Sequence, residues 1–110
     1  MGYEYGIILK SGEYTKAVQE LAQAFQSFST QWINKSDEKG FSLLCPDDKK
    51  WPDRFQIIIQ TADRNTGIAP EGKLYLYCLS YLNGDEEQRA LDCIESVLHR
   101  LGYSYEIDDL

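Results

Sequence analysis

A chain of 110 residues is long enough for one hydrophobic core and too short for two, so we expect a single domain spanning residues 1–110. Hydrophobic residues make up 43% of the chain and charged residues 26%, a balance that argues against disorder. The net charge of −7 disfavours nucleic acid and anionic membrane surfaces as partners.

The chain begins with a predicted strand and a predicted amphipathic helix. Side chains alternate over residues 3–10, which places two tyrosines on the same face as Ile7 and Leu9. Ser11 and a glycine interrupt this pattern. Between residues 13 and 28 the apolar side chains recur at spacings of three and four, which predicts a helix with Ser11 as its N-terminal cap.

A β-hairpin is predicted next, followed by a loop. Short apolar runs at residues 31–34 and 41–45 flank a polar segment, residues 35–40, that ends in glycine. Residues 46–52 are predicted as a loop because two prolines bracket four charged side chains. Trp51 precedes a proline, so we expect it to be extended or in a turn, with its indole packed.

Two further strands are predicted on either side of a polar loop. Residues 55–61 are rich in β-branched side chains and predict a strand. After the loop at residues 62–72, residues 73–82 predict a long strand that is apolar on one face and carries Tyr75, Tyr77, Leu79 and Tyr81 on the other. A strand with two largely apolar faces is typical of the interior of a sheet that is covered, at least partly, on both sides. Alternatively, the tyrosine side is a recognition surface.

The last part of the chain predicts a second helix and a final strand. Asp85 and Gln88 have the spacing of a capping box, and an apolar stripe continues from there to Leu101. Gly102 is expected to end this helix. Residues 103–107 alternate as a strand and are followed by a short acidic tail.

This order of elements predicts an α+β fold. The expected order is β-α-β-β-β-β-α-β, and each helix has one apolar stripe to bury. Two such helices fit best as one layer on one side of a single sheet. We therefore expect a two-layer sandwich, with a mostly antiparallel sheet of about five or six strands and both helices on one face.

No catalytic, metal or cofactor site is predicted from the residue types. His99 is the only histidine, and it falls on the polar face of the second predicted helix, with no nucleophile tied to it by spacing. Cys45, Cys78 and Cys93 are far apart and lie in apolar surroundings, which is typical of reduced thiols in a cytoplasm. The amino-terminal residues lack the features of a signal peptide. We expect a cytoplasmic protein that is not an enzyme and binds no cofactor.

The negative charge is concentrated at the carboxyl end. Residues 83–110 hold eight acids against two arginines, whereas residues 1–82 hold ten acids against nine bases. This distribution predicts a basic protein partner, with carboxylates for electrostatic steering and tyrosines as anchors. The predicted partner-binding residues are Glu4, Tyr75, Tyr77, Tyr81, Asp92, Glu95, Glu106, Asp108 and Asp109. The alternative is that the tyrosines are strand residues that pack against neighbouring strands.

A small, acidic, single-domain chain without catalytic motifs resembles the immunity proteins of bacterial toxin systems, including those of contact-dependent growth inhibition. The resemblance covers the whole chain as general character, so it carries over a role and no residues. It implies an inhibitor that binds and blocks a co-encoded toxin, often a basic nuclease. The alternative function is a small regulatory or ligand-binding domain, or a homodimeric subunit of a larger assembly, with the tyrosine face at the dimer interface or over a pocket.

Overall fold

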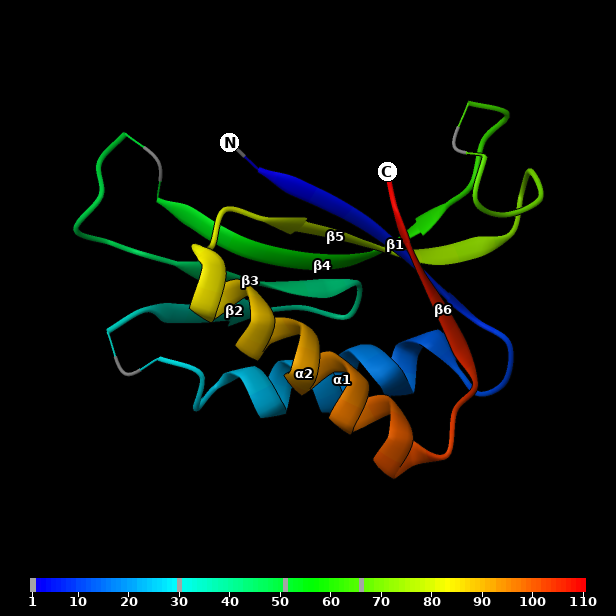
Figure 1. Cartoon of the computed structure of the whole chain (residues 1–110), viewed down its shortest axis with the longest axis horizontal. Helices are drawn as coiled ribbons and strands as arrows, with labels where there is room; N and C mark the ends of the chain where they lie inside the picture. Colours follow the sequence, from blue (N-terminus) through cyan, green and yellow to red (C-terminus); the bar gives the residue numbers. More distant parts are fainter. Residues whose placement is uncertain (1, 30, 51, 66) are drawn as a thin grey trace.

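The computed structural model describes residues 2–29, 31–50, 52–65 and 67–110. Within these residues, the chain forms a six-stranded antiparallel sheet with two helices layered on one face (Figure 1). The elements are β1 (Tyr3–Leu9), α1 (Tyr14–Phe25), β2 (Ile33–Ser36), β3 (Gly40–Leu44), β4 (Asp53–Thr61), β5 (Leu74–Ser80), α2 (Gly84–Leu101) and β6 (Tyr105–Asp109). The predicted α+β two-layer sandwich is confirmed. Trp51, which was expected to be packed, lies outside the described residues.

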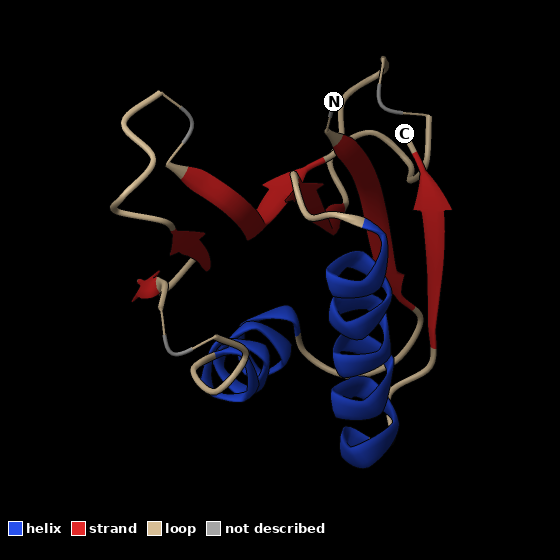
Figure 2. Cartoon of the chain, turned by 60° about the vertical axis from the view of Figure 1, so that its left-hand side comes forward, coloured by secondary structure: helices blue, strands red, loops and turns tan. Residues whose placement is uncertain are grey.

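The strands lie in the order β2-β3-β4-β5-β1-β6, and every neighbouring pair is antiparallel. The tyrosine-bearing strand β5 therefore lies inside the sheet, between β4 and β1, as predicted. Helix α1 carries the chain from β1 to the far edge of the sheet at β2, and α2 carries it from β5 across β1 to the other edge at β6. Figure 2 shows the twisted sheet curving around both helices, which leaves its other face without a helix.

The core lies between the sheet and the two helices. Alternate residues of the interior strands point into it, among them Ile7, Ile57 and Leu76, which are at most 1% exposed. The buried stripe of α1 ends in Phe25, whose ring centroid lies 4.9 Å from that of Phe55 in a stacked arrangement. Helix α2 adds its own stripe, Ala90, Ile94, Val97 and Leu98. Burial of these two stripes places both helices on the same face of the sheet.

The start of each helix differs from the prediction. Helix α1 begins at Tyr14, and its predicted cap Ser11 instead accepts a hydrogen bond on Oγ from the Ser104 amide at 2.9 Å. Ser11 therefore joins the turn before α1 to the turn before β6. In α2 the cap is Asn83 and not Asp85, because the chain is still extended at Asn83 and its side chain accepts a hydrogen bond from the Glu86 amide at 3.3 Å.

The hairpin between β2 and β3 is tighter than predicted. The carboxylate of Asp37 accepts hydrogen bonds from the amides of Lys39 at 2.8 Å and Gly40 at 3.0 Å, which closes the turn within three residues. Gly40 thus belongs to β3 and not to the loop. A Cβ atom at position 40 would lie 2.1 Å from the carbonyl oxygen of Ile57, so only glycine fits beside β4.

Helix α2 ends at Gly102, as predicted, with a positive φ of 75°. The amide of Tyr103 then donates to the Leu98 carbonyl at 3.0 Å, so the chain is still leaving the helix at this point. For that reason β6 begins at Tyr105 and runs through the predicted acidic tail to Asp109. Among the described residues, no helix combines the length and the apolarity needed to cross a membrane.

Candidate functional site

The open face is the side of the sheet opposite α1 and α2. On β5, Leu76 and Cys78 point toward the helices, so Tyr75, Tyr77, Leu79 and Tyr81 belong to the open face. The strand register adds acidic residues to the same face. Glu4 of β1 pairs with Leu79, and Asp108 of β6 pairs with Gly6, while Glu106 pairs with Ile8. The sheet therefore brings predicted tyrosines and predicted carboxylates from three adjacent strands onto one surface.

Part of the open face is covered by the chain itself. A Cβ atom at Gly6 would lie 2.2 Å from Cδ1 of Ile68, so the loop between β4 and β5 fills the space above Gly6. Tyr75, in the next row of side chains, is only 5% exposed, and its hydroxyl donates to Oε1 of Gln60 at 2.9 Å. Tyr75 therefore packs within the structure, as in the alternative interpretation of the tyrosines, and adds little accessible surface.

Tyr77 holds the carboxylate of Glu4 in place on the open face. The Tyr77 hydroxyl donates to Oε1 of Glu4 at 2.5 Å. Burial raises the pKa of Tyr77 above its ordinary value of 10.0, and the hydrogen bond to Glu4 raises it further. Among the described residues, no lysine or arginine forms an ion pair with Glu4. This carboxylate is thus oriented by a neutral donor and keeps its negative charge uncompensated.

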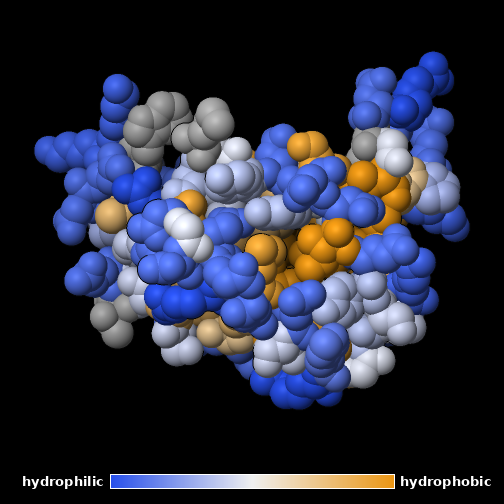
Figure 3. All heavy atoms as spheres, viewed as in Figure 1, coloured by the Kyte–Doolittle hydropathy of each residue, from blue (hydrophilic) through white to orange (hydrophobic). Residues whose placement is uncertain are grey.

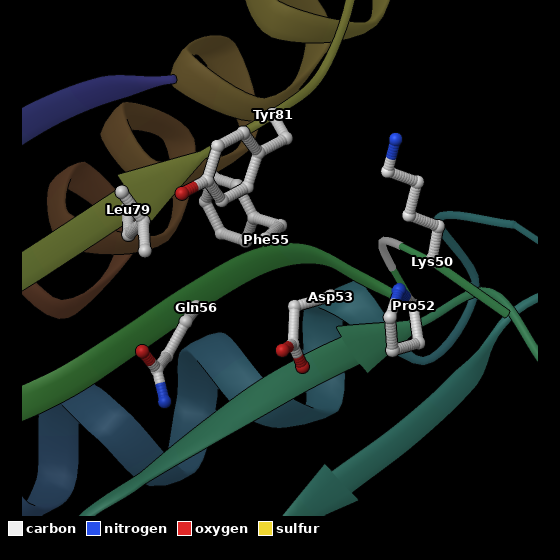
Figure 4. Close-up of a pocket in the computed structure, with 7 residues that line it drawn as sticks. All are labelled: Lys50, Pro52, Asp53, Phe55, Gln56, Leu79 and Tyr81. Carbon is white, nitrogen blue, oxygen red and sulfur yellow. The ribbon is translucent and has the colours of Figure 1, made fainter. Parts of the chain in front are cut away.

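Tyr81 of the open face lines two hollows. One hollow, of about 330 Å³, is lined by Lys50, Pro52, Asp53, Phe55, Gln56, Leu79 and Tyr81. Figure 4 shows Tyr81 and Leu79 along its β5 side and Asp53 and Gln56 along its β4 side. The other hollow, of about 510 Å³, is lined by Gly2, Tyr3, Glu4, Tyr5, Leu79, Tyr81, Asp109 and Leu110. We define the open-face site as Glu4, Asp53, Gln56, Tyr77, Leu79 and Tyr81.

The charges of the open face are divided between its two ends. Glu4, Glu106 and Asp108 lie on β1 and β6, where Lys10 neutralises only Glu106, at 2.9 Å. At the opposite end, Lys35 lies on the edge strand β2, and Arg54 of β4 pairs with a carboxylate of the loop before it at 2.6 Å. The open face therefore carries Glu4 and Asp108 toward β6 and Lys35 toward β2, while Arg54 is neutralised by its own ion pair.

Two predicted partner-binding residues lie on the other layer of the molecule. Asp92 and Glu95 are exposed on α2, where Asp92 accepts a hydrogen bond from Gln88 at 2.9 Å and Glu95 accepts one from Tyr105 at 3.2 Å. Figure 3 shows mostly hydrophilic atoms over α2. Asp109 lines the larger hollow but pairs with Tyr5, so its side chain lies on the helix side of the sheet. The structure therefore groups Glu4, Tyr77, Tyr81, Glu106 and Asp108 on the open face, and it separates Asp92, Glu95 and Asp109 from them.

A buried carboxylate, Glu87, was not predicted as a special residue. It lies in the first turn of α2 and accepts hydrogen bonds from the hydroxyls of Tyr5, at 2.7 Å, and of Ser80. It is one of three consecutive acids in the first turn of α2, where negative charge suits the helix dipole, so its type and position do not distinguish it. The available signal was Ser80, a polar residue on the apolar side of a strand, which needs a partner when it is buried. This cluster ties α2 to β1 and β5 at the end of the sheet nearest the open-face site.

Tyr5→Phe is expected to lose less stability at high pH than the unchanged chain. Burial first, and then the bond to Glu87, raises the pKa of Tyr5 above its ordinary value of 10.0. Its proton therefore stabilises the folded state fully below about pH 10, and this contribution is lost as the pH rises toward the raised pKa. Urea titrations at several pH values from about 9 to 11 measure the slope of the free energy of unfolding against pH. Equal slopes for both chains would contradict the expectation, and Tyr3→Phe is the control for removal of an exposed phenol.

The remaining reactive side chains are held in ordinary packing contacts. His99 is exposed, and a ring nitrogen lies 3.1 Å from the hydroxyl of Tyr105. Cys78 is completely buried, and this burial raises the pKa of its thiol. In the described part of the chain, no three histidine, cysteine or acidic residues come together as a metal site.

The fold and the site together define a class of protein: an α+β sandwich whose sheet has one helix-covered face and one open face with an acidic end and a partly exposed tyrosine. A scan of protein-family models and searches of curated proteins and of solved structures found nothing that matches the chain.

Proposed function

We propose that this chain is a non-enzymatic inhibitor that binds a basic protein through its open face, as an immunity protein covers the active site of a toxin. The observation that carries this proposal is the open-face site. Tyr81 is 39% exposed between two hollows, with Leu79 at their shared border. Tyrosine in a partly desolvated position is a frequent anchor of protein interfaces.

Charge favours a basic partner over a neutral one. The chain has a net charge of −7, and Glu4 and Asp108 have no ion-pair partner among the described residues. A positively charged protein would be attracted to this end of the sheet and oriented as it approaches, which raises the association rate. Nuclease-like toxins fit this description because they must bind nucleic acid with a basic surface.

A second candidate function, a homodimeric subunit, is favoured by the division of charge on the open face. Two copies packed face to face and related by a two-fold axis would bring the acidic β6 end of one copy to the Lys35 end of the other. Sedimentation equilibrium distinguishes the two functions. A monomer at micromolar concentration supports the inhibitor, and a stable dimer that dissociates on Tyr81→Ala supports the subunit.

The inhibitor proposal is tested by comparing capture by the chain with capture by two matched variants. The first variant, Tyr81→Ala with Glu106→Gln and Asp108→Asn, changes exposed residues of the open face. The control, Asp92→Asn with Glu95→Gln, removes the same number of charges from α2. Lysate of the native host is passed over each immobilised chain, and stoichiometric partners are identified by mass spectrometry.

We expect a basic protein on the unchanged chain and on the control, but not on the open-face variant. With the purified partner, the open-face variant is expected to bind at least about thirtyfold more weakly, as for loss of one anchor residue. Rising salt concentration should slow association with the unchanged chain. Equal retention by all three chains, or the absence of any stoichiometric basic partner, would overturn the proposal.

A further inference from the structure

We infer that the larger hollow beside Tyr81 is a subsite for one arginine side chain of the partner; this inference rests on the proposed function. The lining contains the Glu4 carboxylate on the open face and no lysine or arginine among its described residues; its other acid, Asp109, pairs with Tyr5, so that side chain lies on the helix side of the sheet. It also contains Tyr81, which is 39% exposed. An opening that combines an aromatic ring with negative charge favours a cation.

The apolar part of the lining fits the stem of a long basic side chain. Leu79 lies between Glu4 and Tyr81 on the open face, and Leu110 is 45% exposed at the opposite border. The methylene groups of arginine pack on such surfaces while the charged end reaches a polar group. The ring of Tyr81 lies close to Gly2, where a Cβ atom would be only 2.6 Å from it.

The position of the Glu4 carboxylate favours arginine over lysine. Tyr77 donates to Oε1 and fixes the carboxylate without neutralising it. A guanidinium group is planar, bonds carboxylates through two N–H groups and stacks on aromatic rings, whereas an ammonium group acts as a compact charge. The adjacent smaller hollow is a poorer cation site, because Lys50 lines it.

The subsite is tested with a small probe, so that no partner is needed. N-acetyl-arginine-N-methylamide is titrated into the chain at low salt, and backbone amide signals are followed by NMR. The matching citrulline compound has nearly the same shape and no charge. We expect saturable shifts in the millimolar range for the arginine compound, largest at Glu4, Leu79 and Tyr81, and much weaker binding of the citrulline compound.

Three variants complete the test. Glu4→Gln keeps an acceptor for the Tyr77 hydroxyl but removes the charge, and Tyr81→Leu keeps an apolar side chain but removes the ring. Each is expected to weaken probe binding about two- to fivefold, which is typical of one exposed ion pair or one cation–π contact. Asp92→Asn, on α2, removes the same charge as Glu4→Gln and should change nothing.

Several results would overturn the subsite. They are shifts that do not saturate, shifts that spread over the acids of α2, equal binding of citrulline, and equal weakening by Asp92→Asn. Failure of the subsite is distinguishable from failure of the inhibitor function. If partner capture depends on the open face while the arginine probe does not bind, only the subsite is wrong. If the probe binds in this hollow and no basic partner is captured, the subsite stands and the inhibitor function fails.

Discussion

Phe25→Ala is expected to lower the free energy of unfolding by about 3–5 kcal/mol, a large part of the stability of a domain of this size. The Phe25 side chain is 1% exposed, and its ring lies 4.9 Å from Phe55 and 5.2 Å from Phe41, measured between ring centroids. Its ring packs α1 against β3 and β4. Alanine would leave a cavity that these rings, fixed on neighbouring strands, could fill only in part.

Urea denaturation followed by circular dichroism measures this loss. Gln23→Ala is the matched control, because Gln23 is exposed on the same helix and alanine is a good helix former. It should change the stability by less than about 0.5 kcal/mol. A loss below about 1.5 kcal/mol for Phe25→Ala would mean that the aromatic cluster is not the centre of the core.

Glu87→Ala is expected to cost about 2–4 kcal/mol, because it removes two hydrogen bonds to a charged acceptor. Ser80 is completely buried, so water cannot replace the carboxylate as the partner of its hydroxyl. The Tyr5 hydroxyl loses its acceptor as well.

Glu86→Ala is the control for Glu87→Ala. Both substitutions remove one carboxylate from the first turn of α2, so both lose the same interaction with the helix dipole, about 0.3–1 kcal/mol. The difference between the two variants in equilibrium denaturation therefore measures the hydrogen bonds of the buried cluster. If the two variants are equally stable, the cluster contributes nothing and our account of Glu87 is wrong.

The two layers of the fold separate stability from binding. The side chains whose loss should unfold the protein, such as Phe25 and Glu87, lie between the sheet and the helices. Exposed residues of the proposed binding surface, such as Tyr81 and Asp108, belong to the opposite side of the same strands. Variants of the open face are therefore expected to fold, so that loss of binding in them reports on the surface itself.

The helices and strands could be predicted because each leaves a periodic pattern in the chain. The apolar stripe of α2 and its stop at Gly102, and the alternation along β5, follow from the geometry of single elements. The predicted ends of helices and strands were wrong where a polar side chain forms a hydrogen bond with the backbone. Asp37 shortened the hairpin turn, and Ser11 bonded to Ser104 instead of capping α1. Which hydrogen bond such a side chain forms depends on which backbone group lies near it after folding.

The sequence by itself determined the fold class and which residues of one strand share a face, because alternation along a strand is a local property. Only the tertiary structure decided the strand order, and with it which carboxylates stand beside the tyrosines. Glu4 and Asp108 meet on the open face because β1 lies between β5 and β6, whereas Asp92 and Glu95 are carried away on α2. The burial of Glu87 was likewise decided by packing, since a helix pattern cannot show which strand hydroxyl will face it.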